Sequence, residues 1–220
     1  MDAEHLRETY NKYFTEGGPS WSSADLKKTR KVVRRTLSWL RGYGLKKNKL
    51  NVLDVGCATG FYTEAFRQLG NQALGLDYSE IALEKAKTSF PECRFIQMNG
   101  FEPFFKETFD VIFCRGFSGA NTHDIHFIAQ WINRYMICLN PGGYFILSYS
   151  TNFSGKEKEG ETVNLSLKEL HDLASLILGT FCGIKLFHYF GPLSWFKKLL
   201  ERKVLNKERK EYFSLFIRKA

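Results

Sequence analysis

The sequence lacks the features that define several large protein classes. Its 220 residues include five scattered cysteines and no C-x-x-C pair, which argues against a structural zinc site and a disulfide framework. No apolar run is long enough to span a bilayer. The N-terminus, MDAEHLRETY, is charged from its second residue and does not resemble a secretory signal. Together with the absence of repeats, these observations favour one cytoplasmic domain, and the length of 220 residues is typical of a single α/β domain.

Acidic residues are missing from one stretch of the chain. No Asp or Glu occurs between Leu26 and Lys49, where most of the local charge comes from lysine and arginine, and the net charge of the chain is +9. Clustered basic charge attracts nucleic acid, anionic lipid or acidic substrates. The simpler interpretation is a solvated helix face, and we favour it. A second basic stretch, residues 197–210, is partly offset by Glu201 and Glu208.

The most informative stretch that is present is Asn51–Phe66, NVLDVGCATGFYTEAF. An apolar run ends at Gly56, a loop of small residues follows, and a helical pattern begins at Phe61. Glycine at both ends of the loop permits a positive φ and the close approach of a ligand, and the helix start presents backbone N–H groups to it. A second apolar run ends at Asp77, where nucleotide-binding α/β folds bind ribose hydroxyls.

The segment DVGCATG, followed by GLDYS, resembles the first two motifs of the class I S-adenosylmethionine-dependent methyltransferases. The chain departs from the family pattern at Ala58, which replaces the middle glycine. The dinucleotide fingerprint G-x-G-x-x-G fits worse, because residue 61 is also not glycine, and this disfavours a nicotinamide dehydrogenase. The resemblance covers about Leu50–Ser150 by specific motifs and the remainder by pattern.

The alternation of strand and helix patterns predicts a Rossmann-like, doubly wound, mostly parallel sheet with helices on both faces. The resemblance implies seven strands, with an antiparallel last strand between the fifth and sixth. We expect residues 1–45 to form a helical lid and residues 46–220 a catalytic domain, within one globular unit. The expected strands are 52–55, 73–77, 94–98, 109–114, 144–150, 183–190 and 211–218. The expected helices are 25–41, 61–69, 80–89, 124–139 and 166–178, with a turn at residues 140–143.

The resemblance also implies a binding site for S-adenosylmethionine, with S-adenosylhomocysteine as product. Asp77 would accept hydrogen bonds from the ribose hydroxyls, Asn99 replaces the family's adenine-binding aspartate, and Arg115 would reach the cofactor carboxylate or the substrate, or lie on the surface. In the lid, Tyr13 or Trp21 would close the pocket. The cofactor-binding residues implied are Tyr13, Asp54, Gly56, Cys57, Ala58, Gly60, Asp77, Tyr78, Asn99, Gly100, Phe101, Cys114 and Arg115.

The reaction that the resemblance implies is in-line attack of a substrate nucleophile on the sulfonium methyl group. An oxygen nucleophile usually needs a general base, for which His123 is the first candidate and His126 the second. A capping or surface role is the alternative for both histidines. An amine or carboxylate nucleophile needs no base. We expect no metal ion.

Several interpretations of the function remain open. A small-molecule acceptor is favoured, ahead of an RNA acceptor bound by the basic helix 27–41, and ahead of a cofactor-binding protein without catalysis. The motif CRGF after the fourth expected strand disfavours enzymes that methylate DNA amino groups. A basic amphipathic stretch, residues 192–207, suggests peripheral membrane contact through residues 192–203. The acceptor and the oligomeric state are left open.

Overall fold

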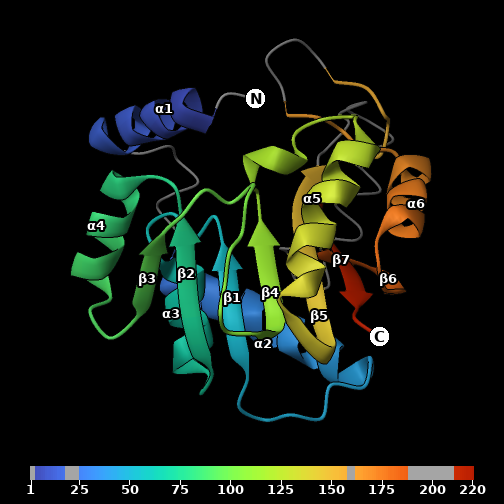
Figure 1. Ribbon diagram of the computed structural model, residues 1–220, viewed down its shortest axis with the longest axis horizontal. Helices are drawn as coiled ribbons and strands as arrows, with labels where there is room; N and C mark the ends of the chain where they lie inside the picture. The colour runs from blue at the N-terminus through green and yellow to red at the C-terminus, as the bar shows by residue number, and fades with distance from the viewer. Residues whose placement is uncertain (1–2, 18–24, 158–161, 188–210) are drawn as a thin grey trace, which may run out of the picture.

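The protein is built around a seven-stranded sheet (Figure 1). The computed structural model describes residues 3–17, 25–157, 162–187 and 211–220. Within them the strand order is β3-β2-β1-β4-β5-β7-β6, and β7 is antiparallel to both of its neighbours. The predicted mixed Rossmann-like sheet is therefore confirmed. The strands are β1 (Asn51–Val55), β2 (Gln72–Asp77), β3 (Arg94–Gln97), β4 (Phe109–Arg115), β5 (Leu139–Thr151), β6 (Thr180–Phe187) and β7 (Glu211–Arg218).

Helix boundaries follow local capping signals. The Asp25 carboxylate accepts the first-turn N–H groups of α2, and Ser79 accepts from the first turn of α4. Ser166 forms a reciprocal capping box with Glu169 at α6. The helices are α1 (Ala3–Thr15), α2 (Leu26–Gly42), α3 (Phe61–Gln68), α4 (Glu80–Ser89), α5 (Ile125–Ile137) and α6 (Leu167–Leu176).

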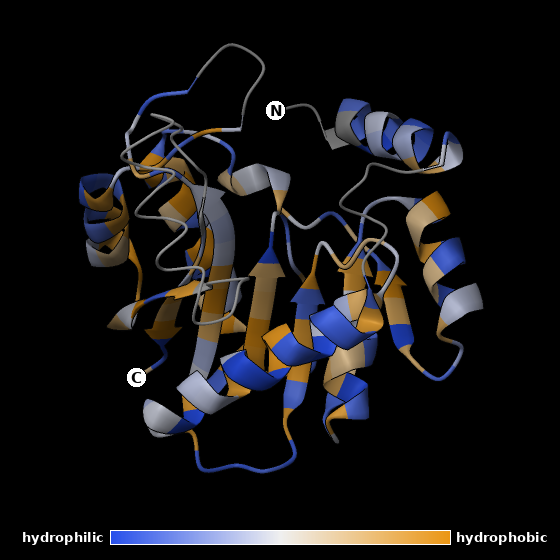
Figure 2. Ribbon diagram, turned by 180° about the vertical axis from the view of Figure 1, so that it is seen from behind, coloured by the Kyte–Doolittle hydropathy of each residue, from blue (hydrophilic) through white to orange (hydrophobic). Residues whose placement is uncertain are grey.

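Helices cover both faces of the sheet, as expected. α2 and α3 pack on one face, while α5 and α6 pack on the other (Figures 1 and 2). The apolar stripe of α2, made by Val33, Leu37 and Leu40, is buried against β1 and α3. Because this stripe belongs to the core, α2 packs as part of the main unit of the fold.

The expected turn at residues 140–143 is wrong. These residues lie inside β5, where Phe109 pairs with Leu139 but Val111 pairs with Tyr144, so the chain bulges between the two pairs. The Gly142 N–H donates to the Lys219 carbonyl, and the Lys219 N–H donates to the Gly143 carbonyl. Turn-forming residues therefore form a bulge here, because Lys219, the residue after β7, supplies hydrogen-bond partners that no local pattern reveals.

The strand β6 forms one edge of the sheet and begins earlier than expected, at Thr180. Its register with β7 shifts between Phe181 and Gly183, and Gly183 has a φ of 148°. The expected membrane-contact segment, residues 192–203, and Trp21 lie outside the described residues. In the part of the chain that the structure describes, no helix is both long and apolar enough to cross a bilayer.

Candidate active site

The candidate site lies at the carboxyl ends of β1, β2 and β4, where the strand order reverses. The glycine loop after β1 is fixed there by backbone contacts. The N–H groups of Gly56 and Cys57 both donate to the Leu76 carbonyl, at 2.8 and 2.9 Å. Gly56 has a φ of 69°, as the glycine pattern indicated, and Ala58, which replaces the family's middle glycine, also takes a left-handed conformation with a φ of 48°.

Gly60 joins the glycine loop to α3 and is required for two reasons. Its φ is 82°, and a Cβ atom at this position would lie 2.7 Å from the ring of Phe95. Gly60 occupies the N-cap position of α3 and has no side chain that could accept a hydrogen bond. The first-turn N–H groups of α3 therefore face the glycine loop with no side-chain cap from this residue. The glycine loop and this helix start together can bind a polar or anionic ligand group.

Asp77 ends β2 with its carboxylate directed toward the glycine loop. One oxygen accepts the Ala58 N–H at 2.8 Å, and the other accepts the Ser79 N–H at 2.9 Å. Burial raises the pKa of Asp77, while these backbone hydrogen bonds oppose the rise. An ionised carboxylate can accept about four hydrogen bonds, so two hydroxyl groups still find acceptors here. The residues present therefore fit the ribose of S-adenosylmethionine.

Sequence reasoning missed Phe117, which lies between the loops after β1, β3 and β4. Its ring stacks on Trp131 with centroids 4.7 Å apart and an interplanar angle of 13°. Cβ atoms built at Gly56, Gly100 and Gly119 would come within 3.3, 2.9 and 2.6 Å of the Phe117 ring. Three glycines thus make room for one aromatic ring beside the glycine loop. The spacing of these glycines was visible in the sequence, but their shared neighbour was not.

The segment after β3 is held in place by α5. The Gly100 carbonyl accepts hydrogen bonds from Trp131 Nε1 at 2.8 Å and from the Tyr135 hydroxyl at 2.7 Å. The Asn99 side-chain oxygen accepts the Phe101 N–H at 3.0 Å, so this oxygen already stabilises its own turn. The ring of Phe101 lies 5.1 Å from that of Phe117. The expected hydrogen bond from the adenine to Asn99 would therefore share this oxygen with the Phe101 N–H.

Three expected cofactor residues are enclosed. Asp54 is 2% exposed and accepts a hydrogen bond from the Thr63 hydroxyl at 2.7 Å, and burial raises its pKa to about 7. Cys57 and Cys114 are buried too, and burial raises the pKa of both thiols. We therefore interpret the side chain of Asp54 as a link between β1 and α3, and expect only the backbone of Cys57 and Cys114 to face a ligand.

The helix α1, part of the segment expected to form a lid, lies above α4 at the carboxyl edge of the sheet (Figure 1). Phe14 is buried, and the Asn11 side chain accepts a hydrogen bond from the Ser79 hydroxyl at 2.7 Å. Burial raises the pKa of Tyr10, a hydrogen bond with Ser118 opposes the rise, and the nearby Asp77 carboxylate adds to it. The expected lid residue Tyr13 is 49% exposed and packs edge-on against Tyr10. Of these two tyrosines, Tyr10 is therefore the one near Asp77.

Arg115 is half-buried at the end of β4, on the same face as α3. Its guanidinium lies over the rings of Tyr62, 5.1 Å from the centroid, and Tyr212, 4.4 Å from the centroid. Tyr62 belongs to the first turn of α3, beside the glycine loop, whereas Tyr212 pairs with Ser150 at the end of β5. The Tyr78 ring lies elsewhere, under Arg7 of the lid, at 5.9 Å.

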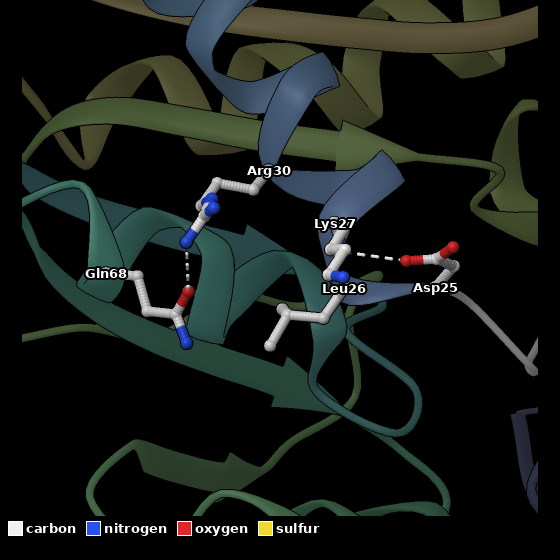
Figure 3. Close-up of a pocket in the computed structure, with 5 residues that line it drawn as sticks. All are labelled: Asp25, Leu26, Lys27, Arg30 and Gln68. Carbon is white, nitrogen blue, oxygen red and sulfur yellow. Dashed lines mark hydrogen bonds between the residues drawn. The ribbon is translucent and has the colours of Figure 1, made fainter.

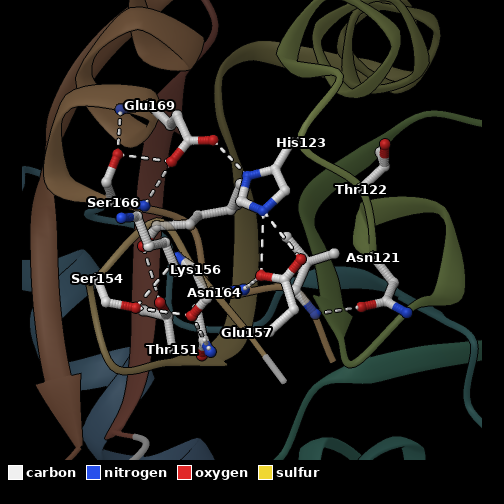
Figure 4. A network of polar contacts seen from close by, with 12 residues as sticks. Asn121, Thr122, His123, Thr151, Ser154, Lys156, Glu157, Asn164, Ser166 and Glu169 are labelled. Carbon is white, nitrogen blue, oxygen red and sulfur yellow. Dashed lines mark hydrogen bonds and ion pairs between the residues drawn. The ribbon is translucent and has the colours of Figure 1, made fainter. Parts of the chain in front are cut away.

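The candidate general base His123 is held between two carboxylates (Figure 4). Its Nδ1 lies 2.5 Å from Glu169 of α6, and its Nε2 lies 3.1 Å from Glu157 of the loop after β5. The Glu169 carboxylate, with Glu157 opposite, raises the pKa of His123. His126, the second candidate, is exposed on α5. A doubly paired imidazole is poorly placed to accept a substrate proton, so a clamp between α6 and two loops fits His123 better.

We expect this clamp to stabilise the protein in a pH-dependent way. The folded pKa of His123 lies above its usual 6.5, so the stabilisation is complete below the unfolded pKa and is lost as the pH rises through the folded pKa. His123→Gln should therefore lower the melting temperature most near pH 6 and least near pH 9. Thermal unfolding from pH 5.5 to 9.5 checks this. His171→Gln, which removes an exposed histidine of α6, is the control, and an equal pH dependence in both variants would contradict the clamp.

A surface hollow lies apart from this site (Figure 3). Its lining residues come from the start of α2 and the end of α3, and Arg30 donates to the Gln68 side chain at 3.3 Å. Because α3 runs from the glycine loop toward the amino ends of the strands, its last residue, Gln68, lies far from the strand ends that build the site. The basic face of α2 (Figure 2) therefore does not form part of the candidate active site.

A sheet of this order, with a glycine loop after β1 and a carboxylate at the end of β2, defines the architecture of S-adenosylmethionine-dependent methyltransferases. Residues 46–211 match the model of a protein family described as a methyltransferase domain. Because the match covers well over half of the chain, the chain belongs to the class I S-adenosylmethionine-dependent methyltransferase family, as its motifs indicated.

Individual relatives are more distant. Malonyl-[acyl-carrier protein] O-methyltransferase of Buchnera aphidicola is 28% identical over 130 residues, which cover 54% of this chain and 48% of the relative. Ubiquinone biosynthesis O-methyltransferase of Leptothrix cholodnii is 43% identical over 51 residues, 23% of this chain and 22% of the relative. The chain thus spans about half or less of these relatives. Magnesium protoporphyrin IX methyltransferase of Synechocystis, solved with bound S-adenosylmethionine, shares the fold at a TM-score of 0.65 and 13% identity, over 100% of this chain and 98% of that one.

Proposed function

We propose that this protein transfers the methyl group of S-adenosylmethionine to an oxygen atom of a small-molecule acceptor. The observation that carries the proposal is the fixed carboxylate of Asp77, which lies beside the glycine loop and below Tyr10 of the lid. Both curated relatives named above are O-methyltransferases by name, which supports oxygen as the acceptor atom.

Each part of the site has a defined task in this proposal. When bound, S-adenosylmethionine supplies an electrophilic methyl group on a sulfonium centre. Asp77 binds the ribose hydroxyls, the start of α3 faces the amino-acid end, and the ring of Phe117 provides an apolar wall beside the glycine loop. The lid, through Tyr10, covers the site and excludes water. The protein contributes alignment and desolvation, which suit a displacement that needs no covalent enzyme intermediate.

The surroundings of His123 favour an acceptor that needs no general base. Carboxylates face both of its ring nitrogens and favour the protonated imidazolium, which cannot accept another proton. An acceptor oxygen that is already ionised at neutral pH avoids this requirement. A carboxylate meets the condition, whereas an ordinary alcohol does not.

The remaining proposals concern organisation and location. From the expected lid of residues 1–45 we retain α1 as the moving element and assign α2 to the catalytic unit, because its apolar stripe is part of the core. We place the activity in the cytoplasm, where five unpaired thiols are stable.

Calorimetric titration with S-adenosylmethionine and S-adenosylhomocysteine tests the cofactor part of the proposal. Transfer of a labelled methyl group to panels of carboxylic acids, phenols and amines tests the reaction. Micromolar binding with transfer to an oxygen acceptor is the expected result. Binding without transfer to any panel member would favour a non-catalytic cofactor-binding protein, and the absence of binding by folded protein would overturn the proposal.

A further inference from the structure

The outward face of α2 is basic along its whole length. The apolar residues Val33, Leu37 and Leu40 are buried in the core, and no exposed residue of α2 has an aliphatic or aromatic side chain. The helix contains no acidic residue, and hydrophilic residues recur along it (Figure 2). All of its lysines and arginines are exposed, and they form what we call the basic face of α2: Lys27, Lys28, Arg30, Lys31, Arg34, Arg35 and Arg41.

Neighbouring residues leave most of this positive charge in place. In the described part of the chain, the single ion pair that involves a cation of α2 joins Lys28 to Asp25 at 3.9 Å. Arg30 donates to the uncharged side chain of Gln68 at 3.3 Å, and the Arg35 guanidinium lies over an aromatic ring, 5.2 Å from its centroid. Neither of these two contacts neutralises a charge, because an amide and an aromatic ring carry no net charge.

Four of the cations form a row along the helix. Lys27, Lys31, Arg34 and Arg41 follow one another at intervals of four, three and seven residues, which places them on one side of an α-helix. At 1.5 Å per residue, the row is about 21 Å long. It begins at the surface hollow of Figure 3, which Lys27 and Arg30 help to line.

The composition of the basic face favours one class of partner. Stable protein–protein interfaces have an apolar centre, and peripheral membrane helices bury apolar side chains beside their cations. Single-stranded nucleic acid is bound by stacking its bases on aromatic rings. The exposed residues of α2 provide neither kind of side chain. The backbone of a duplex needs only cations, because contacts to phosphates supply nearly all of its sequence-independent affinity.

We propose that the basic face of α2 binds the phosphate backbone of a nucleic-acid duplex without reading its sequence. A duplex carries one negative charge per about 1.7 Å of its axis, so a length of about 21 Å carries about 12 phosphates, more than the seven cations of α2. Arginine, which supplies four of these cations, can hold a phosphate group with two N–H donors.

A duplex bound to this face lies away from the candidate active site. The first turn of α2 contacts Gln68, and the chain just after α2 is fixed where the Tyr144 hydroxyl donates to the Tyr43 carbonyl at 2.7 Å. Both contacts lie toward the amino ends of the strands, because Gln68 is the last residue of α3 and Tyr144 pairs with Val111 near the start of β4. The duplex is therefore an anchor and not the methyl acceptor, so its binding does not depend on the proposed function.

Fluorescence anisotropy tests this binding with the full chain and two labelled duplexes, one of DNA and one of RNA. At least one duplex should bind with a dissociation constant of about 1–100 μM near physiological salt. The triple variant Lys27→Gln, Lys31→Gln, Arg34→Gln should bind it at least tenfold more weakly at low salt. Each lost phosphate contact lowers the slope of log K against log salt by about 0.9, so the slope should become shallower by about 2–3.

The matched control removes three cations from other surfaces. Lys87→Gln, Lys106→Gln and Lys168→Gln change α4, the loop after β3 and α6, and all three lysines are exposed. The net charge falls equally in both triple variants, so a general charge effect would weaken both equally. We expect the control to bind the duplex within threefold of wild type and to keep its salt slope. Thermal unfolding identifies a misfolded α2 variant, for which Lys31→Gln alone replaces it and should reduce the slope by about 0.9.

Several outcomes would overturn the proposal. They are no binding of either duplex by wild type at low salt, equal weakening in the two triple variants, and unchanged affinity in the α2 variant. Vesicles of phosphatidylcholine and phosphatidylserine are a parallel probe by co-sedimentation. Vesicle binding that the α2 variant loses, without duplex binding by wild type, would overturn the proposal and assign the basic face to an anionic membrane surface. Binding of neither probe would leave it as a solvated helix face.

Discussion

Replacing Asp77 by alanine should reduce the affinity for S-adenosylhomocysteine at least tenfold and abolish measurable methyl transfer. The side chain would lose the two hydrogen bonds that a carboxylate accepts from ribose hydroxyls, and a hydrogen bond to a charged group contributes about 1.5–3 kcal/mol. The glycine loop would also lose its contact at Ala58, which Asp77 holds at 2.8 Å. Both effects weaken binding, and calorimetric titration measures their sum.

The matched control is Asp172→Ala. Asp172 also pairs with a polar group, the Lys168 ammonium at 2.5 Å, but it belongs to α6 and its side chain is 37% exposed. Its replacement should leave the dissociation constant within twofold of wild type. Equal affinity in Asp77→Ala and wild type would remove the ribose-binding role of Asp77, provided that both proteins show the same cooperative thermal unfolding.

Gly75→Ala should strongly destabilise the protein, because it adds a methyl group at a closely packed position beside the site. Its Cβ would lie 2.6 Å from the Phe95 ring, 2.7 Å from the Thr63 hydroxyl and 2.9 Å from the Cys57 sulfur. These neighbours belong to β3, α3 and the glycine loop, so relief of one contact disturbs the others. Overpacking of this kind costs about 1–3 kcal/mol, which corresponds to a melting temperature lowered by about 3–10 °C.

Gly42→Ala provides the control for this substitution. Gly42 is the last residue of α2, a Cβ atom added there would meet no heavy atom within 4 Å, and its φ is not positive. Alanine favours the helix by roughly 1 kcal/mol over glycine, so the melting temperature should stay the same or rise slightly. A comparable loss of stability in both variants would mean that the close packing around Gly75 is not the cause.

Local chemistry made much of the fold predictable from the sequence. The helix α4 begins at the expected residue because Ser79 caps it, and β7 was expected over its full length from a short apolar run. The glycine loop and Asp77 were found because a tight turn and a ribose-binding acid each require particular residue types at a fixed spacing. Such features depend on neighbours within a few residues.

Features that depend on distant partners were not predictable. Tyr10 and Tyr13 lie three residues apart on one helix, and only the packing of α1 on α4 decides that Tyr10 faces Ser118. The carboxylates that hold His123 come from 34 and 46 residues further along the chain. Phe117 likewise owes its position to three glycines on separate loops. In each case the sequence specified the residue, but its role depended on the folded arrangement.

The bulge in β6 bears on how copies of this protein behave when they are crowded. An outer strand presents a row of backbone donors and acceptors on which another chain can extend the sheet and start aggregation. In β6 the register shift between Phe181 and Gly183, together with the φ of 148° at Gly183, interrupts that row. Lys185, two residues further along, adds a charge to the same strand. The edge, which is eight residues long, is therefore a poor template for intermolecular β-pairing.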